Sequence, residues 1–224
     1  MEAQRNISIH NQYWGSSNSN IPIEERNMFR FPNLPYSYSA IKNIADVQHL
    51  KNHFENFHLK SFEELQQSVE YPKVEKMDIE MLFKNKAEFS KQLIDIAGTI
   101  YNHQMYWDNL SPYCGKQSGE LINAIEESFG NIFHMKEQFL ITGMDQECCG
   151  WLWMIVNPQN KLELVTTKQN TNPLMSDADV KDRPLMAIDL WEHAYAGKFP
   201  NNKEAYLNNV WMYINWNEIS KRFE

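Results

Sequence analysis

Apolar side chains recur at helical spacing through the first half of the chain, and this pattern predicts two long amphipathic helices. The first covers about 39–57 and the second about 81–107, with Pro112 as a breaker beyond its end. Their apolar stripes are Ile41, Ile44, Val47 and Leu50, and then Leu82, Phe83, Phe89, Leu93, Ile96 and Ile100. Between them, Ser61 and Glu64 fit a capping box that opens a shorter helix. Two long helices joined by a moderate connection predict an antiparallel helical hairpin.

The second half of the chain mixes helical and strand-like patterns. A helical pattern over about 118–144 is interrupted at Gly130, and an aromatic helical pattern covers about 202–223. Three short apolar runs predict strands at 150–156, 162–166 and 185–190, the first two joined by a turn at 157–160. The pattern therefore predicts an α+β protein, with a helical N-terminal half followed by helices around a small antiparallel sheet.

We divide the chain into a polar N-terminal extension at 1–30, a helical-hairpin domain at 31–115 and a C-terminal α/β domain at 116–224. The extension contains three acidic residues and three arginines. A mitochondrial presequence is rich in arginine and poor in acidic residues, so the extension is a poor match to one. Three interpretations of the extension are open: a disordered tail, the remnant of a processed leader, or an arm that binds a partner. The sequence does not distinguish among them.

Charge and cysteine content narrow the classes of protein. The net charge of −8 argues against broad, non-specific binding of nucleic acid. The three cysteines, Cys114, Cys148 and Cys149, form no disulfide framework and favour a reducing compartment. No apolar run approaches the roughly 20 residues that a membrane span needs.

The candidate chemistry lies in an Asp189-x-x-x-His193 pair that follows the third predicted strand. Carboxylate oxygen and neutral imidazole nitrogen suit iron, manganese or zinc, although a buried Asp–His hydrogen bond is the simpler explanation of two such residues alone. His49 and His103, on the two long predicted helices, complete a set of three nitrogens and one oxygen. A closed structural zinc site more often uses thiolates, so this set indicates a centre with room for a small ligand.

Four segments resemble one family, the iron/manganese superoxide dismutases, and the resemblance runs from about residue 31 to residue 223. They are Phe31-Pro32-Asn33-Leu34-Pro35-Tyr36, Asn102-His103-Gln104-Met105-Tyr106-Trp107, Cys149-Gly150-Trp151-Leu152-Trp153 and Asp189-Leu190-Trp191-Glu192-His193-Ala194-Tyr195. The resemblance implies an N-terminal α-helical hairpin, then an α/β domain with a three-stranded antiparallel sheet.

The same resemblance implies function. The expected activity is conversion of superoxide to dioxygen and hydrogen peroxide at one Fe or Mn ion per chain, bound by His49, His103, Asp189 and His193. Glu192 resembles the family residue that reaches a ligand histidine of a like-folded partner, His193 here, so a homodimer or heterodimer is implied.

Several residues expected around the metal depart from the family pattern. His53 matches the histidine one turn after the first ligand, Phe57 stands where relatives carry a tyrosine, and Trp151 is expected to line the pocket with Trp107, Trp153 and Trp191. Thr99 and Asn170 occupy the two positions at which the family usually carries a glutamine. Ala196 stands in place of a second tyrosine, and Lys203 stands in place of an arginine. We therefore expect a weakened enzyme.

A second hypothesis explains the same departures. In this interpretation the chain is a non-catalytic structural subunit of a large mitochondrial assembly such as the mitochondrial ribosome, where contact with nucleic acid is only indirect. Retention of all four expected ligands favours the enzyme, whereas the altered surroundings and the N-terminal extension favour the subunit. Either interpretation suits a mitochondrial location, with the cytoplasm as the alternative.

Overall fold

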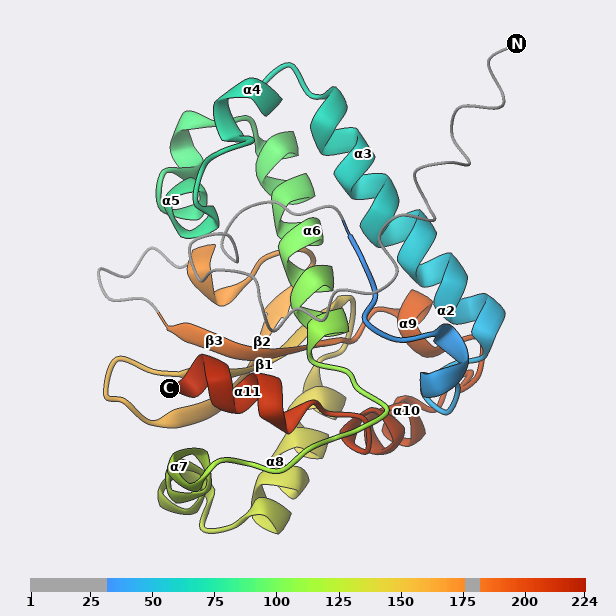
Figure 1. The fold of residues 1–224 in the computed structure, drawn as a ribbon, viewed down its shortest axis with the longest axis vertical. Coiled ribbons are helices and arrows are strands. Elements are labelled where there is room, and N and C mark those ends of the chain that lie inside the picture. Colours follow the sequence, from blue (N-terminus) through green and yellow to red (C-terminus); the bar gives the residue numbers. More distant parts are fainter. Residues whose placement is uncertain (1–31, 176–181) are drawn as a thin grey trace.

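The computed structural model describes residues 32–175 and 182–224, and Figure 1 shows their arrangement. The N-terminal half is helical, and its short elements are the 3-10 turns η2 and η4 and the π-helix η3. Its elements are η2 (Tyr38–Ile41), α2 (Val47–His53), η3 (Phe54–Leu59), α3 (Lys60–Gln67), α4 (Tyr71–Val74), α5 (Ile79–Lys84), η4 (Lys86–Glu88) and α6 (Lys91–Asp108).

The C-terminal half adds a sheet to further helices. Its elements are α7 (Gly119–Phe129), α8 (Ile132–Asp145), β1 (Gly150–Val156), β2 (Leu162–Lys168), η5 (Pro173–Met175), β3 (Arg183–Asp189), α9 (Glu192–Tyr195), α10 (Lys203–Trp211) and α11 (Trp216–Phe223). The predicted fold class, a helical hairpin followed by an α/β domain with a three-stranded antiparallel sheet, is therefore confirmed.

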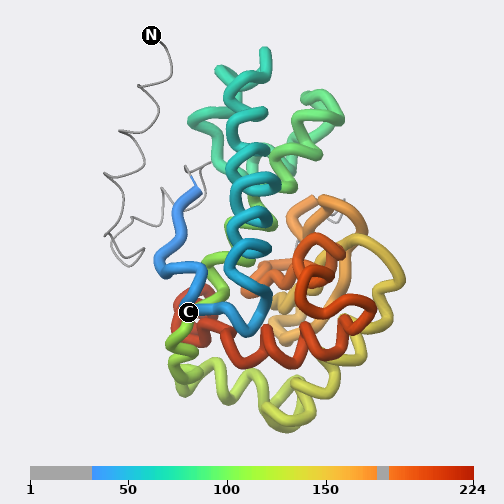
Figure 2. Tube along the Cα trace, turned by 90° about the vertical axis from the view of Figure 1, so that its right-hand side faces the viewer, coloured from blue at the N-terminus to red at the C-terminus, as the bar shows by residue number. Residues whose placement is uncertain are grey.

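A continuous rod made of α2, η3 and α3 forms one arm of the hairpin, and Figure 2 shows it as one unbroken coil. Asp46 caps its start by accepting a hydrogen bond from the amide of His49. The middle segment, η3, is a π-helix, whose wider turn rotates the following side chains relative to an α-helix. Ser61 lies inside the rod and donates its hydroxyl to the carbonyl of Phe57, so its predicted role as a helix cap is wrong.

The other arm of the hairpin is α6, which packs beside α3. The predicted single helix over 81–107 is interrupted, because Ser90 caps a new helix by accepting from the amide of Leu93. Near the far end of α6, Tyr36 donates its hydroxyl to the carbonyl of Trp107, which ties the start of the described chain to this helix.

The sheet has the strand order β2-β1-β3, and both pairings are antiparallel. Every residue of the central strand β1 is buried, as expected for a strand covered on both faces. In Figure 1, α6 lies on one side of the sheet and α7, α8 and α11 lie on the other. The register places Trp151 opposite Asp189, at the end of β3 where the chain leaves the sheet.

Two hydrophobic clusters hold these layers together. The larger joins the sheet to α6, α8, α10 and α11, and the smaller fills the space among α3, α5 and the first half of α6. Gly130, with φ of 82°, ends α7 as the sequence predicted, whereas the helix predicted over 202–223 is two helices. Val47, expected on the apolar stripe, is 45% exposed at the first position of α2. None of the described helices meets the length and apolarity that crossing a membrane requires.

Candidate metal centre

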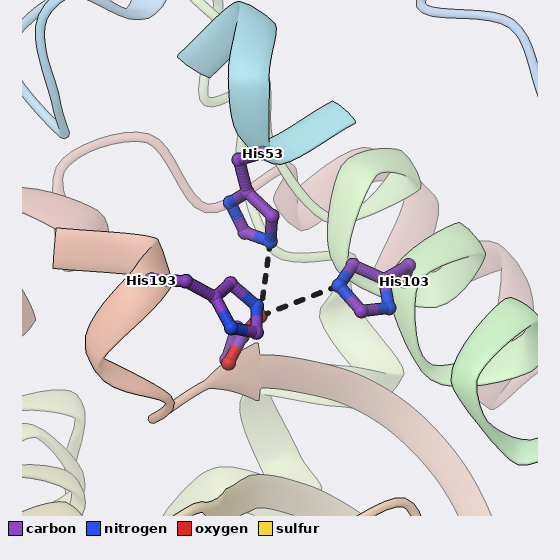
Figure 3. A group of neighbouring side chains, drawn as sticks. His53, His103 and His193 are labelled. Carbon is purple, nitrogen blue, oxygen red and sulfur yellow. Dashed lines mark hydrogen bonds and ion pairs between the residues drawn. The ribbon is translucent and has the colours of Figure 1, made fainter. Parts of the chain in front are cut away.

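Four side chains from the two halves of the molecule converge at one point between the hairpin and the sheet. Their donor atoms, one each from His53, His103, Asp189 and His193, all lie within 4.8 Å of one another. Figure 3 shows the three imidazoles around the carboxylate: His53 comes from the end of α2, His103 from α6, and His193 from α9 just beyond β3. The fold therefore brings together donors that are far apart in the sequence.

Asp189 organises the cluster with both carboxylate oxygens. Its Oδ1 accepts a hydrogen bond from the amide of Trp191 at 2.8 Å, which fixes the carboxylate at the end of the strand. Its Oδ2 lies 3.0 Å from His53 Nε2, 3.2 Å from His193 Nε2 and 3.6 Å from His103 Nε2. Tyr206 donates its hydroxyl to the backbone carbonyl of Asp189 at 2.8 Å and holds the residue from behind.

Burial and charge set the protonation states of these groups. Desolvation lowers the pKa of His53 to about 4 and that of His103 to about 3, although the carboxylate of Asp189 opposes both shifts. Burial alone raises the pKa of Asp189, but His193 and the hydrogen bonds from His193 and His53 outweigh it and hold that pKa well below its usual range. Near neutral pH, His53 and His103 are therefore neutral and the carboxylate is ionised.

The hydrogen bonds of the rings suit a metal ion. His103 Nδ1 lies 2.8 Å from the carbonyl of Thr99 and donates to it, which leaves the lone pair of Nε2 directed into the cluster. His103 Nε2 is buried and has no hydrogen-bond partner within the part of the chain that the structure describes, and His53 Nε2 is buried beside the carboxylate of Asp189. A cation at this point satisfies both nitrogens and the ionised carboxylate, so the donor set fits iron or manganese.

The structure corrects one predicted ligand. His49 lies outside the cluster, with its Nε2 2.6 Å from the backbone carbonyl of His193, and His53 takes the place predicted for it. The two histidines are one turn apart on the same face of α2, so helical spacing alone does not separate them. The signal that was missed is burial: His53 is buried, whereas His49 is only half-buried.

This correction also moves the position at which relatives were expected to carry a tyrosine. This position lies two helical turns after the first ligand. If the ligand is His49 the position is Phe57, but with His53 as the ligand it is Ser61. Phe57 instead stacks on His193, with ring centroids 3.7 Å apart and an angle of 11° between the planes. The ring is 37% exposed, so it lies at the edge of the site and covers one face of a ligand.

Aromatic side chains enclose the inner side of the cluster. Trp151 is fully buried and meets His103 edge-on, with centroids 5.0 Å apart, and Trp107 lies 4.9 Å from the ring of His53. Trp191 stacks at 5.6 Å on His193. Trp153, which was expected with them, directs its indole N–H to Thr167 Oγ1 instead.

The remaining departures from the family pattern have structural partners of their own. The backbone carbonyl of Asn170 accepts from Asn102 Nδ2, and the amide of Ala196 donates to the carbonyl of Glu192 at the end of α9. Lys203 Nζ donates to the carbonyl of Gln146 at 2.5 Å. Burial lowers the pKa of Lys203, and its ammonium is directed to backbone oxygens at the C-terminal end of α8.

A helical hairpin set against a three-stranded antiparallel sheet, with three histidines and an aspartate gathered between them, defines a candidate mononuclear metalloprotein. The family models agree. The alpha-hairpin domain of the iron/manganese superoxide dismutases matches residues 28–111, and the C-terminal domain of the same family matches residues 117–222. The chain belongs to the iron/manganese superoxide dismutase family.

Individual relatives support the same family. The chain is 30% identical over 198 residues to a superoxide dismutase [Mn] of Acinetobacter baylyi, and the aligned region covers 87% of this chain and 87% of the relative. It is 31% identical over 201 residues to superoxide dismutase [Mn] 3 of Leptolyngbya boryana, covering 87% of this chain and 82% of the relative. A superoxide dismutase [Mn] of Listeria innocua is 33% identical over 205 residues, covering 88% of this chain and 98% of the relative.

Proposed function

We propose that this protein is a superoxide dismutase that uses one metal ion bound by His53, His103, Asp189 and His193. The observation that carries the proposal is the convergence of three imidazole nitrogens and one ionised carboxylate within 4.8 Å, with three of the four residues buried. When bound, iron or manganese supplies the alternation between the +3 and +2 states that oxidises one superoxide to dioxygen and reduces another to hydrogen peroxide. The net reaction consumes two superoxide ions and two protons.

The chain itself determines how superoxide and protons reach the site. The side chains of His53 and Asp189 are fully buried and that of His103 is 2% exposed, whereas that of His193 is 18% exposed. The open side of the cluster is therefore the side of His193, where Phe57 stacks on the ligand ring. We propose that superoxide enters there, past an aromatic ring that carries no hydroxyl to pass on a proton.

The buried tyrosines behind Asp189 are poor sources of protons. The hydroxyls of Tyr106 and Tyr206 lie 3.2 Å apart, and Tyr206 donates to the carbonyl of Asp189. Burial raises the pKa of Tyr106 and of Tyr206 well above the usual value, so both rings keep their protons near neutral pH. Protons consequently come from the solvent side.

We propose manganese as the metal, because the relatives described above are named superoxide dismutase [Mn]. The donor set itself accepts either metal. Elemental analysis of protein purified from its native source tests this choice, and iron at one ion per chain would overturn it.

We further propose a twofold dimer in which Glu192 approaches His193 of a second copy. Glu192 is exposed at the first turn of α9, next to the most exposed ligand. Replacing Glu192 with alanine should shift the protein toward the monomer and lower its metal content, because a ligand histidine loses a hydrogen-bond acceptor. Sedimentation with metal quantification tests this, and a fully metal-loaded monomer of the unchanged protein would contradict it.

The activity is tested by following superoxide decay after pulse radiolysis, at equal protein concentration and known metal content. The metal-loaded protein should accelerate the decay, and a His53→Ala variant should not. Metal-loaded protein with no effect on superoxide would overturn the enzymatic proposal and favour the structural subunit considered from the sequence.

A further inference from the structure

His49 occupies a defined place beside the cluster although it contributes no donor to it. It lies one turn before His53 on α2, and its Nε2 is 2.6 Å from the backbone carbonyl oxygen of His193. A carbonyl oxygen only accepts hydrogen bonds, so Nε2 carries the proton and donates. The contact joins the first helix of the hairpin to the backbone of a residue 144 positions later.

The carbonyl that His49 binds lies in a segment with little helical support. The helix α9 spans four residues, Glu192–Tyr195, and the amide of Ala196 closes it by donating to the carbonyl of Glu192. Carbonyls in the last turn of a helix need partners from outside it, and an isolated turn of this length is not stable by itself. His193 is also the most exposed of the four candidate ligands, so its position depends on such external contacts.

Gly197 shows how closely the His49 ring is fitted to this segment. A Cβ built on Gly197 would lie 2.2 Å from His49 Nδ1 and 2.8 Å from both Cγ and Cε1 of the ring. Gly197 does not adopt the positive φ found at Gly115 and Gly130, so the backbone itself does not require glycine here. The imidazole of His49 is therefore the feature that demands a residue without a side chain.

We propose that His49 is a positioning residue for the metal centre: its donated hydrogen bond fixes the backbone of His193, so that the imidazole of His193 stays directed at Asp189. The role in metal binding rests on the proposed function. The hydrogen bond from His49 to the carbonyl of His193, called the tether below, does not. Groups that orient a metal ligand typically change metal affinity by about 10–100-fold when they are removed.

The experiment uses a double-mutant cycle on the full chain, with His49→Ala, Gly197→Ala and the combined variant. Affinity for Mn²⁺ is measured by competition with a chelator, and amide hydrogen exchange of residues 193–197 is measured on metal-free protein. His49→Ala should lower Mn²⁺ affinity by about 10-fold and accelerate exchange in this segment. Gly197→Ala should have a similar effect, because a methyl group displaces the ring, and it should add nothing to His49→Ala.

Two further variants separate positioning from general stability. His49→Gln places an amide N–H where the imidazole N–H stood, so it should restore most of the affinity and the protection from exchange. Lys198→Met removes a different link between the same regions, the 2.6 Å bond from Lys198 Nζ to the carbonyl of Lys42. It should leave Mn²⁺ affinity unchanged, because it does not touch a ligand residue.

Each outcome decides the inference. Unchanged exchange at residues 193–197 in His49→Ala, or additive effects of the two alanine substitutions, would overturn the tether. Accelerated exchange with unchanged Mn²⁺ affinity would overturn the positioning role. If the unchanged protein binds no Mn²⁺ or Fe²⁺, the proposed function fails and the positioning role fails with it, while the exchange data still decide the tether.

Discussion

Two of the regions that supply the candidate ligands differ in how well their sequence specifies geometry. At the end of β3, Asp189 ends a strand and His193 follows in the first turn of a helix, and both were predicted to belong to one cluster. Along α2 and η3 of the rod, an aromatic ring or imidazole recurs every four residues, at His49, His53 and Phe57. The predicted ligand, His49, was one turn away from His53, the residue in the cluster.

The difference lies in what fixes the register. A strand that ends inside a sheet has one register, because its pairing with β1 places Asp189 opposite Trp151. A helix that carries histidines at repeated intervals of four residues offers the same face at each turn, and a π-helix then changes the period. Spacing is therefore decisive at the strand end and ambiguous along the rod.

The largest expected effect tests the choice between the two histidines of α2. His53→Ala should lower Mn²⁺ affinity by more than about 100-fold, beyond the range for residues that only orient a ligand, because it removes one of four donors. His49→Ala should retain measurable binding. The measurement is metal content after equilibration with a competing chelator. A larger loss of Mn²⁺ affinity in His49→Ala than in His53→Ala would restore the ligand set first predicted from the sequence.

Much of the fold was accessible from the sequence because local signals agreed with tertiary packing. The bounds of β1 and the break at Gly130 follow from apolar runs and a glycine, and the structure has both. The breaks at Ser90 and Asn215 were missed, although each caps a helix by accepting a hydrogen bond from a backbone amide. An uninterrupted apolar pattern hid these caps, since helical periodicity continues across a short break.

His58 is a second residue of the rod that helical spacing alone does not place. His134 is exposed, whereas His58 is only 2% exposed. It stacks on His103 at 5.9 Å, because the π-helix turns it inward. The sequence carries no periodic signal for this rotation.

Replacing His58 tests that inward rotation. His58→Ala should lower the free energy of unfolding of metal-free protein by about 2–4 kcal/mol, because it leaves a cavity beside Phe54 and His103. His134→Ala is the matched control and should change stability by no more than about 0.5 kcal/mol. Equal, small effects in denaturant unfolding would mean that His58 is a surface residue after all.

The pH dependence of metal-free protein tests the buried half of the cluster. Burial lowers the pKa of His53 to about 4 and of His103 to about 3 from the usual 6.5, so below that value the unfolded chain binds protons that the folded protein does not. Stability should be nearly complete above about pH 7 and should fall by about 2 kcal/mol between about pH 7 and 5.5. His53→Gln should remove about half of that loss, and an unchanged slope would show that His53 is not buried as a neutral ring.

The smallest expected effect concerns Phe57, the point at which the rod touches the ligand of the other region. Its ring lies parallel to that of His193 at 3.7 Å, and such contacts contribute about 0.5–1.5 kcal/mol. Phe57→Ala should therefore lower Mn²⁺ affinity by about 2–10-fold, and Phe57→Tyr, which keeps the stacked ring, should not. Measured with His49→Ala in a second cycle, the two losses should not be additive, because both residues restrain His193. Additive losses would show that the tether and the stacked ring act on the site independently, and would separate the contributions of α2 and η3 to holding the exposed ligand.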